Sequence, residues 1–193
     1  MTDLPSVVIF DLDGTLLDSD DALAAAFVNL GVAPGDVTRG HVVAEECARL
    51  GISLEDYLAA YDTEVSEPFP GVEAMLAGVG RWAVCSNKHP RSGRRELERL
   101  GWMPEVALFA DAFDGPKALP PVLDLLGVDP GAALFVGDTA HDEACAASAG
   151  TSFAWAGWNP RTTPSGGWSV LADPAELSRL LAGASPGDRG GRR

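Results

Sequence analysis

Residues 7–10, Val7-Val8-Ile9-Phe10, lead directly into Asp11-Leu12-Asp13-Gly14-Thr15. Four consecutive apolar residues of β-branched and aromatic type predict a central strand of a parallel sheet. Since ligands bind beyond the carboxyl ends of the strands in such sheets, we expect Asp11 and Asp13 to lie at an active site. Two neighbouring buried carboxylates repel one another unless a cation or a shared proton offsets their charge. This stretch therefore predicts a metal partner elsewhere in the chain.

The composition indicates a folded globular protein that does not bind nucleic acid or anionic membranes. Of the 193 residues, 46% are hydrophobic and 22% are charged, which suits one good core and a small appended domain. The formal net charge of −14 repels nucleic acid and anionic lipid surfaces. No apolar run approaches the ~18 residues of a membrane helix. The first residues lack the basic start of a signal peptide. The three cysteines form no Cys-x-x-Cys pair. We therefore expect a cytoplasmic protein.

A segment with helical patterns interrupts the chain after the first strand. Residues 19–69 contain three amphipathic patterns, of which the first is expected to be capped by Ser19 and the third by Ser53. The segment closes at the breaker Pro68-Phe69-Pro70-Gly71. We expect residues 19–69 to form a small all-α cap domain, and residues 1–18 and 70–184 to form the core domain.

Helices and strands alternate through the rest of the chain. Short apolar runs near 82–85, 106–110, 132–136 and 152–154 alternate with helical patterns near 72–79, 90–100, 118–126, 141–149 and 174–182. This alternation predicts right-handed crossovers and therefore an α/β fold, with a doubly wound, Rossmann-like parallel sheet covered by helices on both faces. We expect the final residues 185–193, rich in Gly and Arg, to be disordered.

Lysine is scarce in this chain. Of the 14 basic residues, only Lys88 and Lys117 are lysines. In a chain that otherwise avoids lysine, a compact ammonium is a candidate for a specific role. We favour Lys117 for that role and expect Lys88 to face solvent.

Four polar segments fall at or just after predicted strand ends, where a parallel sheet brings them to one edge. Together they supply four carboxylates, a hydroxyl and an ammonium, which is the inventory for metal-assisted transfer of a phosphoryl group. The segments are Asp11-Leu12-Asp13-Gly14-Thr15, Ser86-Asn87-Lys88, Lys117 and Gly137-Asp138-Thr139-Ala140-His141-Asp142.

In this order the motifs resemble those of the haloacid dehalogenase superfamily of phosphohydrolases, specifically the phosphoglycolate phosphatase-like members with a helical cap. The resemblance implies that Asp11 is the nucleophile, which forms an aspartyl phosphate, and that Asp13 is the general acid and then the general base. It also implies that Mg²⁺ is bound by Asp138 and Asp142, with the Asp11 carboxylate and the Asp13 backbone carbonyl completing the ligands. The presence of Asp13 argues against the dehalogenase and ATPase branches and favours a small phosphorylated metabolite as substrate.

The same resemblance implies that Ser86 and Lys117 are catalytic residues that hold the phosphoryl oxygens. The capped relatives usually have Pro directly after this lysine, whereas here Lys117 is followed by Ala118-Leu119-Pro120, which leaves the geometry of the loop open. The further candidate substrate contacts are Thr15, Asn87, and two residues near the start of the second helix of the insert, Arg39 and His41.

Three alternatives remain at this point. A phosphomutase of the same fold would return the phosphoryl group to the substrate instead of to water. A receiver-type signalling domain also uses a phosphorylated Asp, Mg²⁺, a hydroxyl and a Lys, but its phosphorylated residue follows the third strand, where this chain has Asp111. A non-catalytic interaction protein would not need the complete set of catalytic residue types. The sequence does not predict the oligomeric state.

Overall fold

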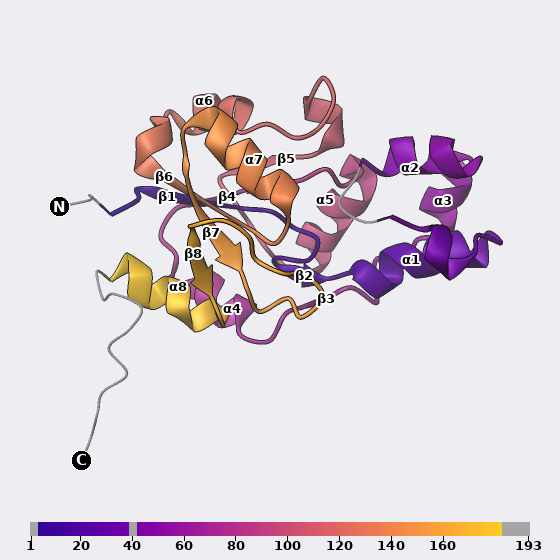
Figure 1. The fold of residues 1–193 in the computed structure, drawn as a ribbon, viewed down its shortest axis with the longest axis horizontal. Coiled ribbons are helices and arrows are strands. Elements are labelled where there is room, and N and C mark those ends of the chain that lie inside the picture. The colour runs from indigo at the N-terminus through magenta and orange to yellow at the C-terminus, as the bar shows by residue number, and fades with distance from the viewer. Residues whose placement is uncertain (1–3, 39–41, 183–193) are drawn as a thin grey trace, which may run out of the picture.

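The computed structural model describes residues 4–38 and 42–182. Within them, six parallel strands form one sheet in the order β5-β4-β1-β6-β7-β8 (Figure 1). The strands are β1 (Val7–Phe10), β4 (Trp82–Cys85), β5 (Val106–Leu108), β6 (Ala133–Gly137), β7 (Ser152–Ala156) and β8 (Ser169–Leu171). The predicted α/β fold with a doubly wound parallel sheet is confirmed.

Helices cover both faces of the sheet because the inner strands alternate their side chains between two apolar clusters. In β1, Val8 and Phe10 pack in the cluster that contains residues of α4, α5 and α8, whereas Val7 and Ile9 pack in the cluster that contains residues of α6 and α7. Figure 1 shows α6 and α7 on one side of the sheet and α4 and α8 on the other. These helices are α4 (Val72–Gly78), α5 (Pro90–Arg99), α6 (Pro120–Leu126), α7 (Ala140–Ala149) and α8 (Pro174–Leu181).

The first strand lies at the centre of the sheet. Ile9 is in register with Ala83 of β4 on one side and with Phe135 of β6 on the other. All four residues of β1 are buried. A strand that is paired along both edges and covered on both faces must be apolar throughout, which explains the unbroken run of residues 7–10.

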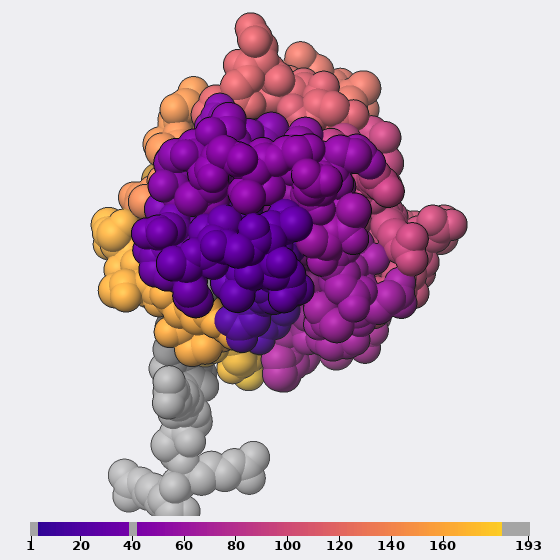
Figure 2. All heavy atoms as spheres, turned by 90° about the vertical axis from the view of Figure 1, so that its right-hand side faces the viewer, coloured from indigo at the N-terminus to yellow at the C-terminus, as the bar shows by residue number. Residues whose placement is uncertain are grey.

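Three helices follow β1 and form a cluster of their own. They are α1 (Asp20–Asn29), α2 (Val43–Leu50) and α3 (Leu54–Ala60). Phe27, Cys47 and Tyr57 are buried between them in a cluster that contains no strand residue of the sheet. The helices lie beyond the carboxyl end of β1 (Figure 1), and their atoms cover much of that side of the molecule (Figure 2). The limits 19–69 of a separate cap domain stay a prediction.

The first helix begins directly after Ser19, as expected, but without the expected capping hydrogen bond. Ser19 precedes α1, but its side chain makes no capping hydrogen bond and instead donates to Asp13. The expected cap of the third helix is present, because the backbone N–H of Asp56 donates to Ser53 Oγ at 3.4 Å. Ser19 thus occupies the N-cap position, but Asp13, six residues upstream, takes the hydrogen bond of its hydroxyl.

Several short elements were not predicted. A two-stranded antiparallel ribbon of β2 (Leu17–Asp18) and β3 (Glu67–Pro68) joins the two chain segments that lead into and out of the helical insert. Strand β8 extends the sheet beyond β7. Short elements carry too few residues to show a period, and β8 has only one buried residue. The residues described contain no helix long and apolar enough to cross a membrane.

Candidate active site

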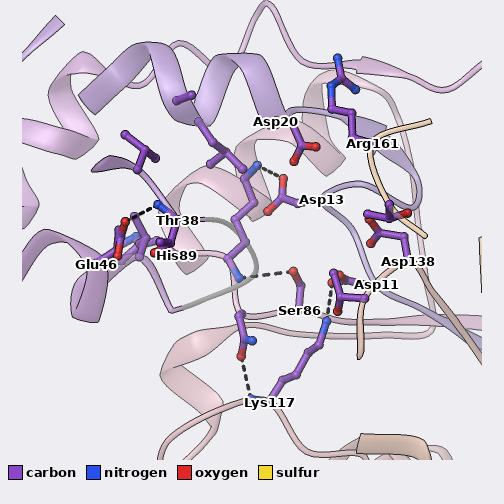
Figure 3. A pocket seen from close by; sticks show the side chains of 18 of the residues that line it. Asp11, Asp13, Asp20, Thr38, Glu46, Ser86, His89, Lys117, Asp138 and Arg161 are labelled. Carbon is purple, nitrogen blue, oxygen red and sulfur yellow. Dashed lines mark hydrogen bonds and ion pairs between the residues drawn. The ribbon is translucent and has the colours of Figure 1, made fainter. Parts of the chain in front are cut away.

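Three neighbouring strands place polar residues at one edge of the sheet. Asp11 follows β1, Ser86 follows β4 and Asp138 follows β6, and β1 is paired with both other strands. Lys117 reaches the same point from the loop before α6, and Figure 3 shows it directed at Asp11, with Asp138 on the other side. The four segments singled out in the sequence therefore meet at the carboxyl ends of the strands.

The centre of this edge is a buried acidic cluster with one lysine. Carboxylate oxygens of Asp11, Asp138 and Asp142 all lie within 4.8 Å of one another. Lys117 Nζ lies 2.8 Å from Asp11 Oδ1 and 2.6 Å from Asp142 Oδ1. One ammonium therefore pairs with two of the three carboxylates, and the cluster carries a negative charge when all its members are ionised.

Burial makes that charge costly. Removal from water raises the pKa of Asp11 to about 7, although Lys117 acts in the opposite direction. Burial, reinforced by repulsion from Asp11 and Asp142, raises the pKa of Asp138 to about 8. Burial by itself lowers the pKa of Lys117, but the attraction of Asp11 and Asp142 outweighs it, so that the net pKa lies above its usual range. The cluster is stabilised by added positive charge, either protons or a cation.

The backbone passes very close to the carboxylates of the cluster at two glycines. Gly14 has a φ of 77°, and a Cβ at this position would lie 2.4 Å from Asp138 Oδ2. A Cβ on Gly137 would lie 2.4 Å from the Cβ of Asp142. Two glycines thus let the chain pass directly against the carboxylates. A set of hard oxygen donors is typical of sites for Mg²⁺ or Ca²⁺, so the acidic cluster fits a divalent cation.

Hydrogen bonds hold the two acids of the last motif in place. Asp138 accepts from Thr15 Oγ1 at 3.2 Å and from Asn159 Nδ2 at 2.8 Å. Asp142 Oδ2 accepts from the backbone N–H and the hydroxyl of Thr139, which caps α7. Asn159 carried no signal in the sequence, because it is an isolated polar residue after the last predicted strand. Its position beside Asp138 comes only from the fold.

Some of the predicted substrate contacts line the cavity beside the acidic cluster, and others do not. Thr15 was expected to contact substrate, but its side chain is fully buried and donates to Asp138, so it orients an acid instead. Ser86 lines the cavity, as does Asn87, whose Oδ1 accepts from the backbone N–H of Lys117 at 2.7 Å. Asn87 thus fixes the loop that carries Lys117, which lacks the usual proline. Arg39 and His41 lie outside the described residues.

The expectation that Lys88 faces solvent is wrong. The side chain of Lys88 is 2% exposed, and its Nζ lies 2.6 Å from Asp13 Oδ1, 2.8 Å from Glu96 Oε2 and 2.8 Å from the hydroxyl of Tyr61. Asp13 Oδ1 also accepts from Ser19 Oγ at 2.5 Å. Sequence reasoning missed Glu96 because a Glu within a strongly charged helix is typical of a solvated face.

A cavity of about 420 Å³ adjoins these groups. Polar residues of the sheet edge line one side of it, and apolar residues of the helical insert, including Leu23, Phe27 and Val43, line the other. Arg161, from the loop after β7, lies at this cavity and pairs with Asp18 and Asp21 beside the start of α1. The mixture of apolar and polar lining suits a small organic molecule with one anionic end.

The fold and the site together define a class of α/β enzymes with an acidic cluster beyond a central parallel strand and a helical insert after that strand. The sequence pattern of haloacid dehalogenase-like hydrolases matches residues 8–156. The chain therefore belongs to the haloacid dehalogenase-like hydrolase family, as its motifs predicted.

Relatives of known name lie within the same family. The chain is 30% identical to N-acetylmuramic acid 6-phosphate phosphatase of Pseudomonas aeruginosa, over 90% of this chain and 93% of that one. It is 33% identical to phosphoglycolate phosphatase of Xylella fastidiosa, over 82% of each chain. The solved structure of CbbY from Rhodobacter sphaeroides, 20% identical, has the same fold with a TM-score of 0.70 over 90% of this chain and 96% of that one. The two phosphatase relatives place the chain among the phosphatases of the family.

Proposed function

We propose that this protein is a Mg²⁺-dependent phosphatase that hydrolyses a small phosphate monoester through an aspartyl-phosphate intermediate. The observation that carries the proposal is the juxtaposition of Asp11 with Lys117 at the centre of a buried acidic cluster, beside a cavity that Asp13 and Ser86 also line. The names of the two phosphatase relatives support a small phosphorylated substrate.

In the first half of the reaction, a carboxylate oxygen of Asp11 attacks phosphorus. The bond between Asp11 and phosphorus forms as the bond between phosphorus and the ester oxygen breaks. Asp13 gives its proton to that oxygen, so that a neutral alcohol departs. Lys117 holds Asp11 Oδ1 at 2.8 Å, which orients the attacking carboxylate. Lys117 and Ser86 bind the non-bridging oxygens, where charge is concentrated.

In the second half, water attacks the phosphorus of the aspartyl phosphate. Asp13, now ionised, takes a proton from that water, and the bond between phosphorus and Asp11 breaks. Inorganic phosphate leaves, and Asp11 returns to its carboxylate form. The atoms and charges of the enzyme are thereby restored for the next cycle.

Asp11, Asp138 and Asp142 are the residues that would hold Mg²⁺. When bound, the ion supplies positive charge that offsets the repulsion among these carboxylates and the incoming phosphate. Thr15 and Asn159 orient Asp138 for this purpose, and Thr139 orients Asp142. Such outer contacts set the direction of ligand oxygens in metal sites.

The alternative of a receiver-type domain gains no support. Asp111, which follows β5, has a side chain that is 46% exposed and pairs with Arg94 at 3.1 Å. It does not line the cavity that Asp11 and Lys117 share. A phosphomutase would share the first half-reaction, and the fate of the phosphoryl group separates it from a phosphatase.

The test is a phosphate-release screen over metabolite esters, including phosphoglycolate and N-acetylmuramic acid 6-phosphate, with Mg²⁺ present. We expect free phosphate without any added bisphosphate, and no release by Asp11→Asn or in excess chelator. Equal release by Asp11→Asn and the parent protein would reject the nucleophile. Isomerised phosphate ester in place of free phosphate would indicate the mutase.

A further inference from the structure

A second buried lysine lies beside the catalytic centre and is not used by the mechanism above. Lys88 follows β4, and its ammonium lies among Asp13, Glu96 and Tyr61 at 2.6–2.8 Å. Tyr61 OH also donates to Glu96 Oε1 at 2.6 Å and lies 2.9 Å from Ser66 Oγ. We call Lys88, Glu96 and Tyr61 the lysine triad. Its side chains are buried, and it joins residues from three separate parts of the chain.

The ammonium of Lys88 is surrounded by groups of the protein. Its Nζ donates hydrogen bonds to Asp13 Oδ1 and to the hydroxyl of Tyr61, and it forms an ion pair with Glu96 Oε2 at 2.8 Å. Two of these three partners are carboxylates, whose charge strengthens the contacts. Lys88 is therefore held by the protein itself, and its effect on the reaction passes through Asp13.

The contacts of Asp13 separate the roles of its two oxygens. Oδ1 accepts from both Lys88 Nζ and Ser19 Oγ. An oxygen that accepts two hydrogen bonds is a poor site for a proton, because protonation would oppose both donors. The proton of the acid form therefore belongs on Oδ2, and the lysine triad fixes the direction of that oxygen.

The triad also connects Asp13 to the helical insert. Glu96 lies on α5, which packs against the sheet, whereas Tyr61 directly follows α3 of the insert. Tyr61 and Tyr57 lie in the apolar cluster of the insert, and their rings are stacked with centroids 6.0 Å apart. Glu96 bonds to Lys88 and Tyr61 together, so the position of the insert and the orientation of Asp13 depend on the same carboxylate.

We propose that Lys88 is a positioning residue, held by Glu96 and Tyr61, which aims Asp13 Oδ2 at the leaving-group oxygen. This inference rests on the proposed phosphatase function and deepens it. It distinguishes the two lysines, because Lys117 contacts the nucleophile, whereas Lys88 acts on the acid that protonates the alcohol.

The test compares phenyl phosphate with p-nitrophenyl phosphate, which have the same reacting group but different leaving groups. Phenolate leaves poorly and needs a proton, whereas p-nitrophenolate leaves readily without one. The measurement is kcat/KM, which reports the steps up to departure of the alcohol. For Lys88→Met and Glu96→Gln we expect kcat/KM for phenyl phosphate to fall at least about 10-fold more than for p-nitrophenyl phosphate, within the range of a general acid. For Tyr61→Phe, which keeps the ring and both carboxylate partners of Lys88, we expect a smaller loss of the same kind.

Two controls separate positioning from folding. Arg91 lies on the same helix as Glu96, and Arg91→Met breaks only its exposed ion pair with Glu55 of α3. This variant should leave the ratio of kcat/KM for the two esters unchanged. In an Asp13→Asn background, Glu96→Gln should not change the ratio of kcat/KM for the two esters any further, because residue 13 then has no acidic proton to position. Glu96→Gln and Tyr61→Phe keep the size of each side chain and carry the test if Lys88→Met does not fold.

Equal losses on both esters in Glu96→Gln and Tyr61→Phe, or no loss at all, would overturn the inference while leaving the phosphatase intact. A further change of the ratio by Glu96→Gln in the Asp13→Asn background would also overturn it. A parent protein that releases phosphate from neither ester would overturn the proposed function and this inference together.

Discussion

Two buried lysines stand in closely similar charge settings on either side of the same cavity. Lys117 lies between Asp11 and Asp142, and Lys88 lies between Asp13 and Glu96, with separations of 2.6–2.8 Å in both cases. Each pair of carboxylates more than offsets the loss of water around its lysine, so that the net pKa of each ammonium lies above its usual range.

The two settings differ in what surrounds them. The partners of Lys117 belong to the acidic cluster, where a third carboxylate, Asp138, leaves an excess of negative charge for a cation to offset. The partners of Lys88 include the hydroxyl of Tyr61 from the helical insert. Within the described part of the chain, these partners do not belong to a group of three His, Cys, Asp or Glu side chains that could hold a metal ion. The same ion-pair chemistry thus suits phosphoryl binding in one place and positioning of an acid in the other.

The comparison predicts the largest loss of activity at Lys117. Lys117→Met removes the only ammonium of the acidic cluster, and we expect kcat for phosphate release to fall by at least about 10³-fold for both good and poor leaving groups. Steady-state kinetics at saturating Mg²⁺ on the two phenyl esters measures this. A loss confined to phenyl phosphate would assign Lys117 the role that we propose for Lys88.

The next largest effect is on stability and falls at Lys88. Lys88→Met leaves Glu96 fully buried without its cation, and we expect a loss of about 3–5 kcal/mol in the free energy of unfolding. Urea denaturation followed by circular dichroism measures it. The double variant Lys88→Met with Glu96→Leu removes both charges and should recover much of this loss, because apolar replacement of a buried pair is often neutral.

A surface pair provides the matched control for that measurement. Arg91→Met breaks the exposed pair with Glu55 and should cost less than about 1 kcal/mol. A loss at Lys88 no larger than at Arg91 would mean that the Lys88 setting is solvated and would contradict the burial on which the comparison depends.

The acidic cluster predicts a pH-dependent effect of Mg²⁺ on stability. Asp11 and Asp138 have folded pKa values of about 7 and about 8, above the ordinary 3.8, so each group binds its proton more tightly in the folded state. The contribution of these two groups to the free energy of unfolding is fully present below pH 3.8, where both are protonated. It is lost as the pH rises through their folded pKa values of about 7 and about 8. Without Mg²⁺ we therefore expect the Tm to fall between pH 5 and pH 8.

Added Mg²⁺ should restore this stability at the upper end of that pH range. A ligand at one hundred times its Kd stabilises the folded state by about 2.7 kcal/mol. Differential scanning calorimetry should show a larger shift of Tm by Mg²⁺ at pH 8 than at pH 5, where protons compete for the carboxylates. An equal shift at both pH values would contradict metal binding by these acids.

The smallest predicted effect concerns Asn159. Asn159→Ala removes the donor 2.8 Å from Asp138 Oδ2, and we expect about a 10-fold weaker affinity for Mg²⁺ with little change in kcat at saturating Mg²⁺. The Mg²⁺ dependence of phosphate release measures both values. Glu105→Gln, which alters only an exposed pair with Arg81, should leave the affinity unchanged. A lower kcat at saturating Mg²⁺ would place Asn159 in the reaction itself.

The amino-acid sequence is sufficient to predict the central strand, the parallel sheet, the helical insert and the meeting of Asp11, Ser86, Lys117 and Asp138 at one edge. These features follow from local patterns, because four apolar residues in a row specify a buried strand and the residues after parallel strands share one edge. The same patterns predict which residue types carry the chemistry.

The folded structure, and not the sequence pattern, shows which side chains support these residues. It buries Lys88 instead of exposing it, and it pairs Lys88 with Glu96 and Tyr61, which lie 8 and 27 residues away along the chain. It also turns Thr15 away from the cavity and toward Asp138. Such pairings depend on the depth at which two distant elements pack and on the burial that results. A one-dimensional pattern contains neither quantity, so a buried ion pair and a solvated helix face look alike in the sequence.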